Sequence, residues 1–180
     1  MLMYIAIAVA VFVLIVALIL FISTRPAVFR VERSAQISAP GDVVFSIIND
    51  LHQWHRWSPW EKLDPNMQKT FEGPTTGPGS SHAWKGNKKV GSGRNTILDS
   101  KSPEFISMKL EMFAPFACTN QVTFRLAPVD GGTKVTWIME GRNNFMAKGF
   151  SCIMNMDKMI GKDFEEGLAN LNTVTQSASR

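Results

Sequence analysis

The sequence predicts an α+β domain in which a curved antiparallel sheet holds a long helix, preceded by one membrane-spanning helix. Three observations predict this architecture: an uncharged apolar run at the N-terminus, a central series of short strands divided by turns, and an amphipathic C-terminal stretch. The order of one strand, two short helices, consecutive strands and a final helix is typical of α+β proteins.

The N-terminal run, from Met1 to Ile22, contains no charged side chain. At ~1.5 Å per residue, about 21 helical residues of this run extend about 31 Å, close to the ~30 Å hydrocarbon thickness of a bilayer. A secretory signal peptide would need a basic start, a shorter apolar core and a small-residue cleavage site, and this segment has none of them. We therefore predict an uncleaved single-pass anchor over residues 1–24, followed by a linker over residues 25–28.

Charge and cysteine content narrow the class of protein. The chain has 19 Lys and Arg against 15 Asp and Glu, a formal charge of +4 that is too small to indicate nucleic-acid binding. Arg25, Arg30 and Arg33 follow the anchor, which favours contact with anionic lipid and, by the positive-inside rule, a cytoplasmic domain. Cys118 and Cys152 lie in apolar surroundings and are expected to be buried thiols, with a disulfide as the alternative.

The first elements of the domain follow the linker directly. Residues 29–37 alternate apolar and polar positions, apart from an arginine in the apolar set, and this predicts a strand. Pro40 and Asp42 then suit the first turn of a helix, because proline fits there and the positive helix end favours a carboxylate. Residues 50–60 predict a second short helix or turn that Pro59 ends.

Turn sequences divide the stretch from residue 67 to residue 140. They are Gly73-Pro74, Gly77-Pro78-Gly79, Gly91-Ser92-Gly93, Ser102-Pro103 and Asp130-Gly131-Gly132. Between them, alternating apolar residues predict strands, most clearly over residues 106–112, 122–126 and 135–139. Residues 144–174 then carry apolar side chains at three- and four-residue steps, which predicts a long amphipathic helix.

Two stretches resemble the polyketide cyclase/dehydrase-like SRPBCC family. Residues 38–45, Asp50, Trp54 and Trp57-Ser58-Pro59-Trp60 resemble its opening, and residues 160–168 resemble its closing helix. The resemblance covers residues 29–172 and implies a START-like helix-grip domain over residues 29–174, with a tail over 175–180. Members hold lipids, polyketides or hormones in a cavity between sheet and helix, and some are cyclases. Fold resemblance alone does not supply the chemistry.

Aromatic and methionine side chains are the candidates for lining such a cavity. They are Trp54, Trp57, Trp60, Trp84, Met108, Met112, Phe124, Trp137, Phe150 and Met154. The tryptophans either contact a ligand or fill the space between the short helices and the sheet. The methionines either adapt to variable ligands or fill an irregular core.

Asp157 and His82 are the polar candidates. Counting about 100° per residue along the last helix places Asp157 within its apolar stripe. There it either orients a polar ligand group, acts as an acid or base, or pairs with Lys158, Arg94 or Arg125. His82 lies in a predicted strand and either moves protons or has a structural role.

A metal site is not predicted, because His52 and His55 near Asp50 lack further ligands at a recognisable spacing. No other cofactor is expected. Three functions stay open: a membrane-tethered binding module for an apolar or amphipathic small molecule, lipid- or polyketide-like; a cyclase or dehydratase-type enzyme; and an interaction scaffold with a filled cavity. A pocket of ~300 Å³ or more would favour ligand binding.

Overall fold

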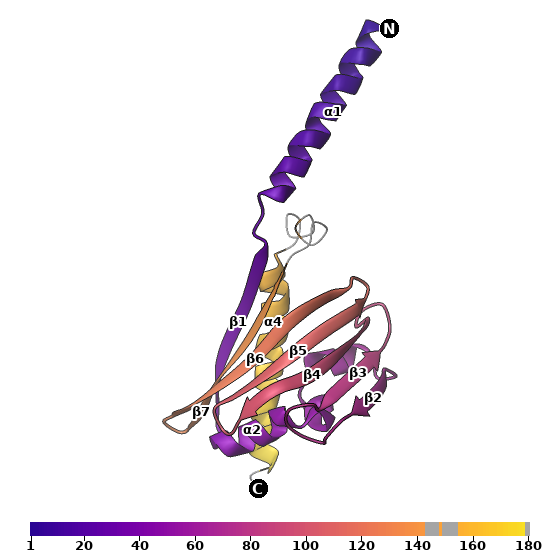
Figure 1. Cartoon of the computed structure of the whole chain (residues 1–180). Coiled ribbons are helices and arrows are strands. Elements are labelled where there is room, and N and C mark those ends of the chain that lie inside the picture. Colours follow the sequence, from indigo (N-terminus) through magenta and orange to yellow (C-terminus); the bar gives the residue numbers. More distant parts are fainter. Residues whose placement is uncertain (143–147, 149–154, 179–180) are drawn as a thin grey trace.

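A seven-stranded antiparallel sheet forms the main layer of the domain, and the C-terminal helix packs against one of its faces (Figure 1). The computed structural model describes residues 1–142, 148 and 155–178. The strands are β1 (Val28–Ile37), β2 (Gln68–Glu72), β3 (Ser81–Lys85), β4 (Ser92–Lys101), β5 (Phe105–Ala114), β6 (Cys118–Val129) and β7 (Gly132–Arg142). The predicted α+β class is confirmed.

From β2 to β7 the strands lie side by side in chain order, and β1 alone departs from it. The spatial order is β1-β7-β6-β5-β4-β3-β2, so the first strand closes onto the last one. β1 pairs with β7 from Val28 opposite Arg142 to Ile37 opposite Thr133. Three short helices connect β1 to β2: α2 (Gly41–Asn49), η1 (Leu51–Arg56) and η2 (Pro59–Leu63). They lie beside the helix α4 (Met156–Ala178).

Helix α4 comes close to the sheet because it carries glycine where it crosses Trp137. A Cβ atom added at Gly167 would lie 2.7 Å from the Trp137 indole. Three residues earlier, the Phe164 ring stacks on the same indole with a centroid distance of 4.1 Å and an interplanar angle of 7°. This contact fixes the distance between helix and sheet.

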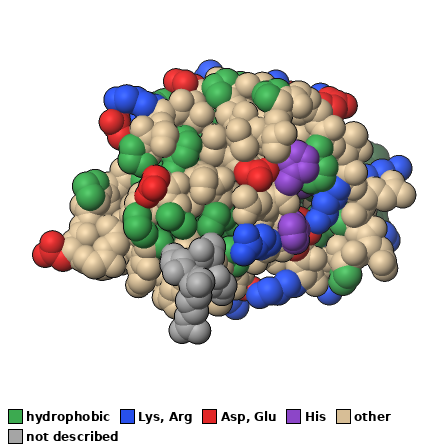
Figure 2. Space-filling model, turned by 90° about the horizontal axis from the view of Figure 1, so that it is seen from below, with side chains coloured by type: hydrophobic (Ala, Val, Ile, Leu, Met, Phe, Trp, Pro, Cys, Tyr) green, Lys and Arg blue, Asp and Glu red, His purple; other side chains and the backbone are tan. Residues whose placement is uncertain are grey.

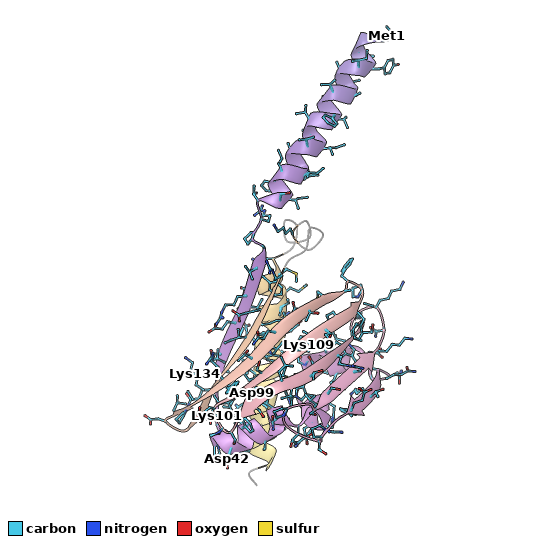
Figure 3. All side chains as sticks on the ribbon, viewed as in Figure 1. Met1, Asp42, Asp99, Lys101, Lys109 and Lys134 are labelled. Carbon is cyan, nitrogen blue, oxygen red and sulfur yellow. The ribbon has the colours of Figure 1, made fainter. Side chains whose placement is uncertain are left out.

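Helix α1 (Leu2–Ser23) stands apart from the domain (Figure 1). Its segment Met3–Ser23 is long and apolar enough to cross a membrane, and none of it is buried within the structure. Figure 3 shows its side chains projecting outward along its whole length. Four residues, 24–27, separate it from β1.

Three expectations need correction. Pro59 does not end a helix but begins η2, because proline fits the first helical turn. Helix α4 continues past residue 174 to Ala178, while most of the predicted helical residues 144–155 lie outside the described residues. Cys118 is exposed and not buried, because it is the first residue of β6 and lies beyond the core. Cys152 lies outside the described residues.

Candidate functional site

Aromatic rings fill the space between α4 and the middle of the sheet. Trp57, Phe124, Trp137 and Phe164 are each no more than 2% exposed. Their rings contact one another, with centroid distances of 5.5 Å from Trp57 to Trp137 and 4.9 Å from Phe124 to Trp137. Three of these four are predicted ligand contacts. The family resemblance implies a cavity in this space. In the structure, these rings pack against one another there.

Of the remaining aromatic and methionine candidates, some are buried in the core and others are only half-buried. Trp54 and Met108 are buried in the same core, and the Trp54 indole N–H donates to the Ile48 carbonyl at 3.0 Å. Trp60 and Met112 are half-buried, and Trp60 meets Trp137 edge to face. These contacts are typical of core packing.

Trp84, on β3, is tied to the neighbouring loop, since its indole N–H donates to the Val90 carbonyl at 3.2 Å. Phe150 and Met154 lie outside the described residues.

Asp157 lies at the N-terminal end of the apolar stripe and is not buried there. It is in the first turn of α4, where its side chain is 57% exposed and forms a two-pronged ion pair with Arg33 of β1. The distances from Arg33 Nη1 to Asp157 Oδ1 and from Nη2 to Oδ2 are both 3.0 Å. Arg33 Nε also donates to Glu165 Oε1 at 2.8 Å. None of the predicted partners of Asp157 makes this contact.

The ion pair decides the protonation state of Asp157. Hydrogen bonding from the Arg33 guanidinium lowers the pKa of the Asp157 carboxyl, and the two carboxylates raise the pKa of Arg33. Asp157 is therefore an ionised structural partner at neutral pH and does not serve as a general acid. Its angular position matches that of Phe164, seven residues later, but Asp157 is in the first turn of α4, beyond the buried part of the stripe.

His82 is one of several sheet residues with an unpartnered buried polar atom, and both of its ring nitrogens are in that state. It lies in β3 as predicted, is 5% exposed, and neither ring nitrogen has a hydrogen-bond partner among the described residues. Phe71 stacks on the His82 ring at 4.8 Å and on the His52 ring at 4.1 Å. Burial lowers the pKa of His82 to about 4, so the ring is neutral at physiological pH and offers one donor and one acceptor.

A pocket of about 160 Å³ adjoins this imidazole. Its lining comes from η1, η2, β2 and β3: Leu51, His52, His55, Glu61, Lys69, Phe71 and His82. The Lys69 ammonium pairs with the Glu61 carboxylate at the pocket wall, and both side chains are largely buried. Figure 2 shows histidine side chains beside Lys and Arg side chains on the domain surface turned away from α1. The pocket thus combines an apolar wall, an internal ion pair and a free imidazole.

The pocket is small for a whole ligand. Drug-sized molecules usually occupy about 300–1,000 Å³, so this pocket fits a ring or one end of a longer molecule. A second, more open depression of about 240 Å³ is lined by Ser34, Ala35, Gln36, Val129 and Lys134. None of its lining residues is buried. The His82 pocket is therefore the better candidate site.

His52 and His55 do not join a metal centre in the structure. The His52 ring nitrogen Nδ1 lies 3.2 Å from an Asp50 carboxylate oxygen, and His55 Nδ1 lies 2.7 Å from the His52 carbonyl oxygen. The described part of the chain contains no group of three or more His, Cys, Asp and Glu side chains placed to hold a metal ion. Both histidines form the rim of the His82 pocket.

The fold defines a helix-grip-like protein of the α+β class. The chain belongs to the family described as polyketide cyclase / dehydrase and lipid transport, whose model matches residues 28–176. No curated protein matches the sequence.

Solved structures share the fold at low sequence identity. A protein from Rhodobacter sphaeroides has a TM-score of 0.62 and 16% identity, covering 86% of this chain and 95% of its own. Protein CV1439 from Chromobacterium violaceum has a TM-score of 0.59 and 15% identity over 83% and 97%. Ara h 8.0201 has a TM-score of 0.58 and 15% identity over 83% and 99%. At these identities the likeness establishes the fold alone.

Proposed function

We propose that this protein is a membrane-tethered binding module for an apolar or amphipathic small molecule, lipid- or polyketide-like, whose polar group lies against His82. The observation that carries the proposal is a nearly buried imidazole with two unpartnered nitrogens beside a pocket. A buried polar group without a partner costs roughly 1–3 kcal/mol. A ligand hydroxyl or carbonyl offsets that cost, and Leu51 and Phe71 supply apolar contact.

The family supports this choice of ligand class, because its description includes lipid transport. Helix α1 supplies the tether: it is apolar, unburied and followed by Arg25 and Arg30. A domain held this way stays within a short distance of one leaflet, since only residues 24–27 separate α1 from β1.

Binding has better support than catalysis. A general base works best with a pKa near the operating pH, and the pKa of His82 is about 4 because of burial. Asp157, the other acid–base candidate, is held ionised by Arg33. The cyclase or dehydratase alternative therefore depends on His82 alone.

The test compares His82→Phe with Asp99→Asn in the full-length chain. Protein purified from native membranes is analysed by mass spectrometry for a co-purifying ligand, and then titrated with a panel of lipids and aromatic polyketides. We expect His82→Phe to abolish binding while preserving or raising the melting temperature, because it removes an unsatisfied buried group. Asp99→Asn, a change at an exposed residue outside the pocket lining, should keep binding.

Two outcomes would contradict the proposal or part of it. Empty native protein together with no binding across the panel would count against the proposal. Equal affinity of the His82→Phe variant would remove His82 from the site.

A second candidate function is an interaction scaffold at the membrane. The filled space between α4 and the sheet favours it, because the ring contacts of Trp57, Phe124, Trp137 and Phe164 leave the domain interior packed. Proximity labelling in cells that identifies one protein partner, combined with an empty His82 pocket, would favour this alternative.

A further inference from the structure

The turn between β5 and β6 exposes an apolar surface. We call residues 113–117 the β5–β6 tip; they read Phe-Ala-Pro-Phe-Ala and contain no charge. Phe113 is 56% exposed and Phe116 59%, more than any other aromatic side chain described outside α1. Exposed apolar clusters of this kind usually mark a contact with a partner or a membrane.

The strand register places the β5–β6 tip at the end of the sheet from which α1 leaves. Phe29, the second residue of β1, lies opposite Gly141, which lies opposite Asn120. Asn120 lies opposite Leu110, so residues 111–119 extend beyond this row on the side of Val28. Figure 1 shows this turn on the α1 side of the domain. In contrast, Asp99 and Lys101 lie at the far end (Figure 3).

Basic side chains lie next to the tip. The loop between β3 and β4 carries Lys88 and Lys89, and Lys85 ends β3. All three lysines are exposed, and none of them enters an ion pair with another described residue. The loop lies against the tip, because a Cβ at Gly91 would be 2.1 Å from the Ala114 carbonyl oxygen.

We propose that the β5–β6 tip is a second membrane contact, in which Phe113 and Phe116 enter the bilayer interface and Lys88 and Lys89 lie against anionic headgroups. Phenylalanine side chains of membrane-surface segments enter the headgroup boundary, and lysines near it are attracted to anionic lipid. The proposal rests on the tether of the proposed function, since α1 brings the tip to the bilayer. Two attachment points fix the orientation of the domain, whereas α1 alone leaves it free to turn on residues 24–27.

Depth-dependent fluorescence quenching tests the proposal with the full-length chain in vesicles. A fluorophore on Cys118, in a Cys152→Ser background, reports from the edge of the tip. The same dye on Asp99→Cys, with both native cysteines replaced by serine, reports from the far end. The vesicles contain phosphatidylcholine with or without phosphatidylserine, and a nitroxide-labelled lipid is the quencher.

We expect the Cys118 dye to be quenched several-fold more than the Asp99→Cys dye. Phe113→Ser should lower this quenching several-fold, and Leu98→Ser, which removes another exposed apolar side chain, should not. Lys88→Gln with Lys89→Gln should abolish any increase caused by phosphatidylserine. Unchanged melting temperatures establish that these variants fold.

Flotation separates failure of this proposal from failure of the tether. Protein that does not float with the vesicles contradicts the tether and, with it, the second contact. Protein that floats but shows equal quenching at both positions overturns the second contact and leaves the tether standing. Disulfide cross-linking between Cys118 residues of two chains, without lipid quenching, overturns it in favour of a self-association surface.

Discussion

His82 makes the free energy of unfolding depend on pH, because its pKa differs between the folded and unfolded chain. Its pKa falls from 6.5 to about 4 in the folded protein because burial disfavours the charged ring. The unfolded chain therefore binds the proton more readily between these two values. The free energy of unfolding is fully retained above pH 6.5 and falls as the pH decreases towards 4, by about 3 kcal/mol in total for this group.

We predict that His82→Phe removes this part of the acid sensitivity. Denaturant unfolding at pH 7 and pH 4.5 should show a smaller stability loss in the variant than in the natural chain, and His55→Gln is the matched control. An imidazole NMR titration should give a midpoint near 4 for His82. A midpoint near 6.5 would contradict the burial argument.

The position of Arg33 in the sequence predicts that it has a partner, but not which partner. It falls on the apolar side of the alternating pattern in residues 29–37, and a charge there needs a partner. That signal was available, yet the sequence favoured a contact with lipid headgroups. The structure instead uses Arg33 to join β1 to α4 through Asp157 and Glu165. Gly161 leaves room for its guanidinium, since a Cβ there would lie 2.0 Å from Nη2.

Helix α4 depends on its aromatic contact with the sheet. Phe164 is 1% exposed and stacks on Trp137. We predict that Phe164→Ala lowers the free energy of unfolding by about 3–5 kcal/mol, because transfer energy is lost and a void remains. Denaturant unfolding measures the effect, and Met159→Ala on the same helix, at a side chain 42% exposed, should change stability little. Similar losses in both variants would contradict this packing.

Elements with a strong local pattern were predictable. The strands β5, β6 and β7 alternate apolar and polar residues, and the turns between strands contain glycine or proline, so their positions follow from local physics. The sequence left open whether the cavity is filled, because the answer depends on which rings from distant elements meet. Trp57 of the short-helix region, Phe124 and Trp137 of the sheet and Phe164 of α4 come together only in the folded chain.

The pocket illustrates the same limit. His82 was a candidate from its isolation in a strand, but Glu61 and Lys69 gave no signal, because their pairing across η2 and β2 is a product of the fold. The spacing of His52 and His55 is only a weak indication of a metal site, and in the structure both residues line the rim of the pocket.

The whole molecule is expected to place its domain on the cytoplasmic side. Arg25, Arg30 and Arg33 follow α1, and the positive-inside rule predicts that this flank of the helix lies in the cytoplasm. We predict that a reporter active only in the cytoplasm works when fused after Arg180, and that an exported reporter at the same position is inactive. The reverse pattern would contradict this orientation.

The pairing of β1 with β7 also governs the order of events during synthesis. β1 is made before the other strands of the sheet, but its partner β7 is the last strand made. Such long-range pairing is slow and leaves an open strand edge in the meantime. With α1 as the proposed tether, the open edge of β1 would wait beside the membrane, where fewer other chains are free to pair with it, until β7 closes the sheet.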